Sequence, residues 1–485
     1  MKHVAPWRLG HGTAAAIVTS LLGCHVGPNY HAPTLPADSN TSLVSIDATL
    51  ETATPPRDDW WQLYDDAQLD ALVQEALSAN WDLRTADANF AAARAMATEV
   101  HADRYPSTEA IAGGVYGRDP VTEEILELDG HRPQRLWLFE DIFEVSYEVD
   151  LFGRIHRAIE QANASAESVA AVRDEVRVIV AAQTTRAYAQ VCSLGEELGV
   201  AHHSLDIVTR QADITRERYG AGGDSEFEVE RAQALVEEVR ATVPQLEGVR
   251  RAAVFELAAL LGRTPTNAPW DVEACMAPPH LTTLVPVGDG GSLIGRRPDV
   301  RQAERRLAAS TARIGVATAD LYPSIRLSAF YGGAAPQLSQ LTTNAGLAWG
   351  LGPSVSWTLP NQVRARARIR EAKAGQAAAL ASFDSVVLTA LKETEQALTA
   401  YGAALNQRQA LIAAQARIHR SLDIARGEFA AGSLSPLDLL TTERSLVEFD
   451  AAVASLDAAL VDDQIATFKA LGGGWQSDVQ PRPRP

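Results

Sequence analysis

Two segments of the chain alternate apolar and polar residues with a period of two. In residues 137–151 the odd positions are mainly apolar or aromatic, and the even positions from 144 onward are polar. In residues 347–359 apolar residues alternate with small or polar ones, and the pattern is weaker in 324–331 and weakest in 107–117. One apolar face is typical of a transmembrane barrel strand, although a soluble amphipathic hairpin has the same pattern. The sequence therefore predicts four strands.

Each strongly patterned strand is followed by a long stretch with helical periodicity. No proline interrupts residues 134–243 or 361–435, and a helix over 154–219 would contain 66 residues, or roughly 100 Å at 1.5 Å per residue. A helix of that length must pack along other helices, as in a coiled-coil bundle. Its alanines each bury little area, so we expect stability to depend on assembly. An Ala-rich filamentous rod is the alternative, which the strands disfavour. Residues 60–103 are also helical in pattern.

The strand and the helix that follows it occur twice, 210 positions apart. Gly222 corresponds to Gly432, and the two copies align without a gap from residue 143 to residue 262. A Tyr-Pro pair at 105–106 recurs at 322–323, an offset of 217, so the first predicted hairpin is seven residues longer. A duplicated unit predicts one pseudo-symmetric body rather than about three independent domains.

The predicted fold class is mainly α, with four strands per chain contributing to a transmembrane β-barrel. We expect six segments in chain order: a signal peptide (1–23), an extended Pro-rich strap (24–59), a first repeat (60–262), a linker (263–295), a second repeat (296–472) and a tail (473–485). Four strands cannot close a barrel, because the smallest bacterial barrels have about eight. Two chains would supply eight strands and a filled lumen, and three would supply twelve and an open pore. The strand pattern itself does not choose between them.

The N-terminus has the composition of a bacterial secretory signal. Lys2 and Arg8 precede a short apolar core that ends in Leu-Leu-Gly-Cys at 21–24. About ten apolar residues are too few for a permanent transmembrane helix. The ending resembles a lipobox, which implies that Cys24 is acylated and begins the mature chain. An ordinary signal with a chance cysteine is the alternative. His25 at the next position does not resemble the inner-membrane retention signal.

The charge balance argues against nucleic acid as a partner. The formal net charge is −18, and removal of Lys2 and Arg8 with the signal would make it −20 (−18 − 2). Binding to phosphates needs a basic surface. An acidic surface that keeps the protein soluble accounts for the charge, and a lumen that tolerates cations would suit it too.

The chain carries no recognisable catalytic constellation. No Gly-rich phosphate loop, nucleophile elbow or metal-spaced His/Cys set occurs in the sequence. His202 and His203 would point about 100° apart on a helix, which is poor geometry for one metal ion. Cys192 and Cys275 form no disulfide framework with Cys24, and we expect both to stay unpaired. We therefore expect no cofactor, no metal and no enzymatic activity.

Several motifs resemble those of the TolC-like outer-membrane factors, of the OprM/NodT lipoprotein type. In chain order they are CHVGPNY (24–30), WW (60–61), SYEVDLFGR (146–154), RRPDV (296–300), ADLYPS (319–324) and ALGGGW (470–475). The resemblance covers nearly all of residues 20–476. It departs at 360–363, where the family often has an aromatic residue before a small Asp/Gly turn and this chain has Pro-Asn-Gln-Val.

This resemblance implies a homotrimer with a twelve-stranded outer-membrane barrel and a long periplasmic α-helical barrel. The implied partners are outer-membrane lipid, a periplasmic adaptor (membrane fusion) protein and an inner-membrane RND-type pump, with the chain as the passive exit duct. The same architecture in type I protein secretion is one alternative, and a non-conducting coiled-coil lipoprotein scaffold is a less favoured one. Apolar strand residues are assigned to the barrel wall: Phe143, Val145, Tyr147, Val149, Trp349, Val355 and Trp357.

Two segments have the composition of tight turns between antiparallel helices. In each, a glycine can adopt the left-handed conformation that ends a helix, and a serine three residues later fits an N-cap. An acid three residues after the serine fits the capping box, and a proline fits the first helical position of the second turn. The residues are Gly222, Ser225 and Glu228 in the first turn and Gly432, Ser435, Pro436 and Asp438 in the second.

In the resembled family these turns form the periplasmic tip, where the duct closes and meets the adaptor. The resemblance assigns the periplasmic gate to Asp224 and Leu434, each two residues after its glycine. Three aspartates could attract cations while three leucines seal by dewetting, whereas a turn aspartate without a gate role is the alternative. Adaptor contact is assigned to Arg218, Tyr219, Gly222, Ser225, Glu228, Phe429, Gly432, Ser435, Pro436 and Asp438.

Overall fold

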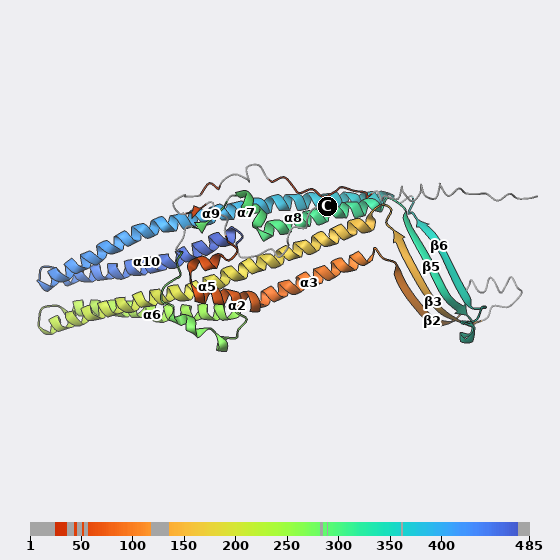
Figure 1. Cartoon of the computed structure of the whole chain (residues 1–485). Coiled ribbons are helices and arrows are strands. Elements are labelled where there is room, and N and C mark those ends of the chain that lie inside the picture. The colour runs from red at the N-terminus through yellow and green to blue at the C-terminus, as the bar shows by residue number, and fades with distance from the viewer. Residues whose placement is uncertain are drawn as a thin grey trace, which may run out of the picture. The chain divides into compact units, whose positions relative to one another are not determined.

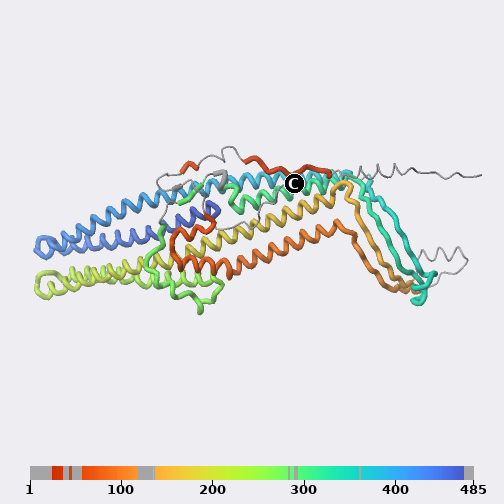
Figure 2. The backbone as a smooth tube through the Cα atoms, in the orientation of Figure 1, coloured from red at the N-terminus to blue at the C-terminus, as the bar shows by residue number. Residues whose placement is uncertain are grey.

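The computed structural model describes residues 25–35, 43–45, 51–52, 57–117, 135–281, 285–288, 290–359 and 362–473. The chain divides into unit 1 (residues 1–33, 91–168 and 304–382) and unit 2 (residues 34–90, 169–303 and 383–485). Figure 1 labels the elements and Figure 2 traces the backbone. The predicted signal peptide, Cys24 and the tail after residue 473 lie outside the described residues.

Unit 1 contains an antiparallel sheet of four strands (Figure 1). In order across the sheet they are β2 (Ser107–Gly117), β3 (Leu136–Val149), β5 (Ser324–Ala335) and β6 (Leu347–Ser356). The four predicted strands are confirmed. β2, whose own pattern is the weakest, forms a full strand of 11 residues. Pairing with β3 along its whole length supplies the stabilisation that its glycines and alanines lack.

The register of the sheet separates an aromatic face from an acidic one. Phe143 pairs with Tyr331, and Tyr331 pairs with Trp349, so three aromatic rings form a row across β3, β5 and β6. These side chains are 50%, 63% and 71% exposed in this chain. On the opposite face Glu109 and Glu144 pair directly between β2 and β3. An exposed apolar face of this kind marks a surface that lipid or protein covers.

The helix boundaries repeat with the two offsets that the sequence shows. Helix α5 (Arg154–Gly220) and helix α6 (Glu226–Leu260) are followed 210 positions later by α9 (Gln362–Ala430) and α10 (Pro436–Ala470). Helix α3 (Trp81–Ala102) recurs 217 positions later as α8 (Pro298–Ala319). The helix predicted over 154–219 is confirmed and contains 67 residues. Figure 2 shows α5–α6 and α9–α10 as two hairpins.

The helical pattern of residues 60–103 is divided into three elements. They are η1 (Trp60–Tyr64), α2 (Ala67–Ala79) and α3. The break lies at Asn80, whose Oδ1 accepts hydrogen bonds from the backbone N–H groups of Asp82 (2.9 Å) and Leu83 (3.1 Å). Its Nδ2 donates to the carbonyl of Leu260 at 3.0 Å. Asn80 therefore caps α3 and ties it to the end of α6.

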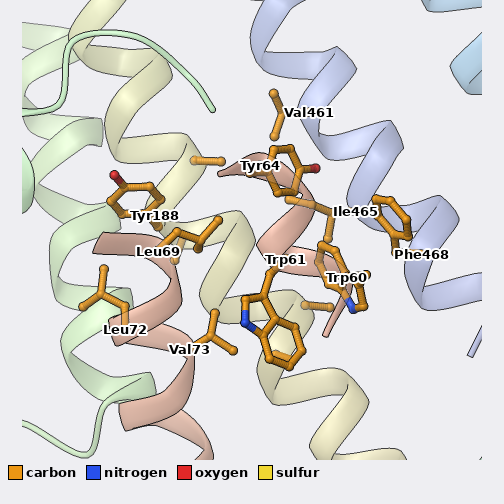
Figure 3. Packing of buried hydrophobic residues seen from close by; sticks show 14 of the residues in the cluster. Trp60, Trp61, Tyr64, Leu69, Leu72, Val73, Tyr188, Val461, Ile465 and Phe468 are labelled. Atoms are coloured by element: carbon orange, nitrogen blue, oxygen red, sulfur yellow. The ribbon is translucent and has the colours of Figure 1, made fainter. Parts of the chain in front are cut away.

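The largest hydrophobic core lies in unit 2 and is shown in Figure 3. Trp60 is fully buried and stacks on Phe468 of α10, with ring centroids 4.8 Å apart. The hydroxyl of Tyr64 donates to Gln464 Oε1 at 3.2 Å. Val73 of α2 is also fully buried in this cluster. The Trp-Trp motif thus anchors the first repeat to the last helix of the chain.

Short elements occupy the strap and the linker. Residues 25–35, in the segment expected to form the strap, have no regular secondary structure. Further along the strap, β1 (Glu51–Thr52) pairs in parallel with β4 (Val285–Pro286) of the linker. The linker also contains η2 (Pro265–Asn267), η3 (Trp270–Ala274) and most of α7 (Gly290–Arg296). A further short element, η4 (Leu338–Gln340), lies between β5 and β6.

The expectation that Cys192 and Cys275 stay unpaired is wrong. Their sulfurs are bonded at 2.13 Å and join the middle of α5 to the loop after η3. Arg250 of α6 holds the same loop, because its guanidinium donates to the carbonyls of Val191 (3.1 Å), Glu273 (2.6 Å) and Cys275 (2.6 Å). The cysteines are 83 positions apart, so only the tertiary fold brings them together.

We expect loss of this disulfide through Cys192→Ser to destabilise unit 2 by about 2–5 kcal/mol, because the crosslink restricts the unfolded chain. Thermal unfolding of the variant measures the loss. Maleimide labelling of the denatured parent should modify Cys192 and Cys275 only after reduction. Labelling of both residues without a reductant would contradict the assignment.

Candidate functional site

The turn between α5 and α6 has the predicted cap geometry. Gly222 adopts φ = 80°, and the N–H of Gly223 donates to the carbonyl of Arg218 at 2.8 Å, which terminates α5. The hydroxyl of Ser225 accepts from the backbone N–H of Glu228 at 3.4 Å. The carboxylate of Glu228 accepts from the backbone N–H of Ser225 at 2.8 Å. The predicted capping box is confirmed in this turn.

The turn between α9 and α10 has the same skeleton with one difference. Gly432 adopts φ = 78°, and Pro436 is the first residue of α10. The Ser435 hydroxyl accepts from the backbone N–H of Asp438 at 3.2 Å and donates to its Oδ2 at 2.7 Å. The Asp438 carboxylate thus engages the hydroxyl rather than the backbone N–H of Ser435. An aspartate is one methylene shorter than the glutamate of the first turn, so the capping box is only half formed.

Arg218 connects the two turns. Its Nε lies 3.0 Å from Asp224 Oδ2, an ion pair whose atoms are not aligned for a hydrogen bond. Its guanidinium carbon lies 4.4 Å from the centre of the Phe429 ring on α9, within the range of a cation–π interaction. The side chain of Asp224 is only 2% exposed, and Phe429 is 6% exposed. We call Asp224, Arg218 and Phe429 the tip clasp.

Both predicted gate residues make contacts within their own chain. Asp224 belongs to the tip clasp, and Leu434 is half-buried against a small hydrophobic cluster. That cluster consists of Ile207, Leu422, Ala425, Phe429, Leu439 and Leu446, with Ile418 beside it. The gate role of Asp224 and Leu434 stays a prediction. Asp224 contacts Arg218 of α5, and Leu434 packs against residues of α5, α9 and α10.

Two apolar side chains at the tip are exposed although the sequence did not single them out. Phe227 is 68% exposed and Leu437 is 45% exposed, beside the predicted contact residue Tyr219 at 46%. A cavity of about 150 Å³ is lined by Phe227 and Leu437, together with Arg231 and Leu440. The only sequence signal for these positions is an apolar residue in the first turn of a helix.

The core of the α9–α10 hairpin contains a row of acids, spaced seven residues apart along α10. These are Glu443, Asp450 and Asp457, and each has a partner on α9. Glu443 lies 3.6 Å from Arg426. Asp450 lies 2.9 Å from Gln415 and 3.3 Å from His419, and Asp457 pairs with Arg408. The residues 210 positions earlier, Gln233, Arg240 and Glu247, are half-buried or exposed. The two hairpins therefore have similar backbones, but the buried acids of α9–α10 have no buried acidic counterparts in α5–α6.

Glu443 is the least satisfied member of this row. Its side chain is 1% exposed, and neither carboxylate oxygen has a hydrogen-bond partner among the described residues. Burial raises the pKa of Glu443 from 4.5 to about 7, and the Arg426 guanidinium offsets the rise only in part. A half-compensated carboxylate destabilises the packing of α9 against α10 when it is charged.

The residues assigned to the barrel wall share the aromatic face of the sheet, except that Trp357 follows the end of β6. Its Nε1 donates to the carbonyl of Leu321 at 3.2 Å. Of the others, Phe143, Tyr147, Trp349 and Val355 are exposed, and Val145 and Val149 are half-buried. Their contact with lipid stays a prediction for the individual residues.

No metal site is found within the described ranges of the chain. No group of three or more His, Cys, Asp or Glu side chains there is arranged to hold a metal ion. His202 and His203 follow each other on α5 without a third ligand from that part of the structure.

A strand sheet with an exposed aromatic face, joined to duplicated long helical hairpins, defines an outer-membrane duct protein. The family model described as outer membrane efflux protein matches residues 72–263 and 291–473, and the chain belongs to this family. The two matched ranges correspond to the two repeats. The chain is therefore a channel protein of the outer membrane that serves efflux.

Individual relatives agree with this assignment along nearly the whole chain. Nodulation protein T of Rhizobium leguminosarum bv. viciae is 28% identical over 97% of this chain and 95% of its own length. The cation efflux system protein CusC of Escherichia coli O157:H7 is 26% identical, over 95% of this chain and 98% of its own. The solved structure of the outer-membrane channel OprN has a TM-score of 0.86 and 34% identity, and covers 93% of this chain and 100% of its own.

The family fold explains the incomplete sheet. Three copies, each with four strands, form a twelve-stranded barrel, and their long helices form the periplasmic α-helical barrel. A periplasmic adaptor and an inner-membrane pump complete the efflux system.

We expect Glu443→Gln to stabilise the α9–α10 hairpin at neutral and alkaline pH. Because the folded-state pKa is raised, the folded chain holds a proton between about pH 4.5 and 7 that the unfolded chain releases, and stability falls as pH rises through that window. At pH 8 the variant should slow amide hydrogen exchange in α9–α10 by about tenfold or more, with little change at pH 5.

Glu448→Gln is the matched control, because Glu448 lies on the same helix with its side chain 67% exposed. It should leave exchange unchanged at both pH values. Exchange at pH 8 that is as fast in Glu443→Gln as in the parent would contradict the account.

Proposed function

We propose that this chain is the passive exit duct of a tripartite efflux pump, and that its helical tip serves as both gate and adaptor-docking surface. The tip clasp supports this proposal most directly. One arginine holds the turn of the α5–α6 hairpin and an aromatic ring of the α9–α10 hairpin at once. A closed tip requires contacts of this kind, which hold two helical hairpins together and can be broken without unfolding either.

Opening of the tip would separate Arg218 from Phe429 or from Asp224. Because the Asp224 side chain is almost fully buried, loss of its cation would leave an uncompensated charge, which is costly. The closed arrangement is therefore favoured when the duct is alone. An adaptor that binds the open arrangement more tightly shifts the population toward it by that difference in affinity.

The exposed side chains at the tip suit the docking of a partner. Phe227, Leu437 and Tyr219 present apolar and aromatic surface to solvent at the two turns. Aromatic anchors that fill small pockets carry much of the energy of protein interfaces. The cavity beside Phe227 could receive one apolar side chain of the adaptor. The predicted contact residues that form the helix ends and caps stabilise the two turns. They are Gly222, Ser225, Glu228, Gly432, Ser435, Pro436 and Asp438.

The duct itself would perform no chemistry, and its cargo would be small solutes delivered by the pump. The family description names efflux, and CusC is named for cation efflux. The energy for transport would come from the inner-membrane partner. Cys24 would be acylated in the mature chain, and the six segments expected from the sequence would be its domain organisation, with the strap joined to the linker through β1 and β4.

Reconstitution in planar bilayers tests the proposed function. The purified, assembled protein should give single-channel conductance, and its removal from cells should raise sensitivity to small toxic solutes. Assembled protein that gives no conductance would indicate a scaffold. Loss of a secreted polypeptide, with unchanged sensitivity to small solutes, would indicate protein secretion.

We expect Asp224→Ala to loosen the tip, because Arg218 then loses its ion-pair partner. The open fraction in bilayer recordings should rise about tenfold, which corresponds to 1.4 kcal/mol. Glu226→Ala is the matched control, since it removes an exposed acid two residues away. Arg218→Lys keeps the charge but loses the planar stack on Phe429, and should have an intermediate effect. Unchanged conductance and cation selectivity in Asp224→Ala would refute the gate role.

A further inference from the structure

The first described residues of the strap lie in a polar site on unit 1. Arg157, in the first turn of α5, is only 3% exposed. Its guanidinium donates to the carbonyls of Val26 (3.2 Å) and Gly27 (3.4 Å) and to Asn29 Oδ1 (2.7 Å). The backbone N–H of Val26 donates to the carbonyl of Phe152 at 3.3 Å. One buried arginine thus binds three polar groups of the strap.

The fit of the strap in this site depends on glycine at two crossing points. Gly27 adopts φ = 92°, and a Cβ atom there would lie 2.5 Å from the Cα of Gly315 on α8. A Cβ atom on Gly315 would lie 2.6 Å from Cγ of Arg157. Strap, α8 and α5 therefore meet at distances that no side chain larger than hydrogen permits.

Contacts on either side of Arg157 hold the same peptide. The Tyr30 hydroxyl donates to Glu304 Oε1 at 2.9 Å, and the guanidinium of Arg305 lies 5.6 Å from the Tyr30 ring. The ring of His25 lies 4.1 Å from that of His156. The peptide from His25 to Tyr30 is held at both ends and in the middle.

The repeat shows that the scaffold itself does not require this site. The residue that corresponds to Arg157 in the second copy is Ala367 (157 + 210), and the residue that corresponds to Gly315 in the first copy is Thr98 (315 − 217). The corresponding helix of the other copy therefore packs with alanine in place of the arginine and with threonine in place of the glycine. Beyond its ion pair with Glu160 of the same helix (2.7 Å), Arg157 directs its hydrogen bonds to the strap.

The geometry points to a docking site for the chain's own acylated N-terminus, which sets the lipid anchor in register with the barrel. This inference rests on the acylation of Cys24 proposed above. Cys24 directly precedes His25 in the sequence. The backbone N–H of Val26 in the docked strap donates a hydrogen bond to the carbonyl of Phe152, three residues after the end of β3 at Val149. Each acylated residue would therefore enter the membrane beside the periplasmic end of β3.

A docked anchor has a consequence for assembly. An anchor on a free strap would allow the subunit to sit at any depth and rotation in the periplasm. A docked anchor holds the end of β3 at the membrane surface, so three subunits present their strand edges at one level. The site would thus act as a positioning device for closure of the barrel.

Gly27→Ala tests the inference from the strap side, because it leaves the body of the protein unchanged. The full chain is produced in cells that acylate lipoproteins and is extracted in detergent. Chymotrypsin cleavage after Tyr30 reports release of the strap, native mass reports the trimer fraction, and the mass of the N-terminal peptide reports acylation. Thr34→Ala, at an exposed position on the same strap and away from the cleaved bond, is the matched control.

Gly27→Ala should retain the acyl mass, raise the rate of cleavage after Tyr30 by about tenfold, and lower the trimer fraction, whereas Thr34→Ala should match the parent. Arg157→Gln should reproduce these changes from the other side of the site. Equal protection of Tyr30 in Gly27→Ala and the parent overturns the docking site. Faster cleavage with an unchanged trimer fraction overturns the positioning role. A parent without acyl groups on Cys24 overturns the anchor role, while conductance still tests the duct separately.

Discussion

The sheet of unit 1 has two open edges, and the rest of the architecture depends on closing them. β2 and β6 form the edges, and each pairs on only one side among the described residues. In water an open edge invites aggregation, and in hydrocarbon each unpaired backbone group costs several kcal/mol. Since the exposed aromatic face places this sheet in lipid, neighbouring copies must complete the hydrogen bonding. Closure by three chains then creates the pore that the long helices continue.

The long helices show the same dependence on neighbours. By length and composition α9 is the one helix in the described part of the chain that could cross a membrane, yet only 17% of its most apolar window is buried within the chain. Alanine-rich surfaces allow close helix approach but bury little area, so one chain alone cannot bury them.

The duplication produced two hairpins with similar backbones, and their buried side chains have since diverged. Both hairpins have apolar residues buried near the tip, such as Leu235 of α6 and Leu439 of α10, but only α9–α10 adds the row of acids that begins at Glu443. Arg218 belongs to the first hairpin and clasps Phe429 of the second. Apolar packing and Arg218 together hold the two hairpins at the tip.

Local features were predictable from the sequence, and long-range pairings were not. Gly222 and Ser225 determine a helix end and a helix start through their own conformations and hydrogen bonds, so the turns could be placed within a residue. The strand β2 could not be recognised with certainty, because its partner and not its pattern makes it a strand. The Cys192–Cys275 disulfide had no local signal, since it joins residues 83 positions apart.

The tip clasp shows the same limit at the functional site. The resemblance assigns Asp224 to the gate by its position after Gly222, but its contact with Arg218 is a feature of the folded turn. The Phe429 ring comes from the other repeat, 211 positions away (429 − 218). Sequence position could place these residues at the tip. It could not show that they contact one another.

The mass of the detergent-solubilised particle tests the central claim most directly. Because one chain supplies four strands with two open edges, native mass measurement should find three chains in each particle. A stable single chain that remains dispersed in water without detergent would contradict the account.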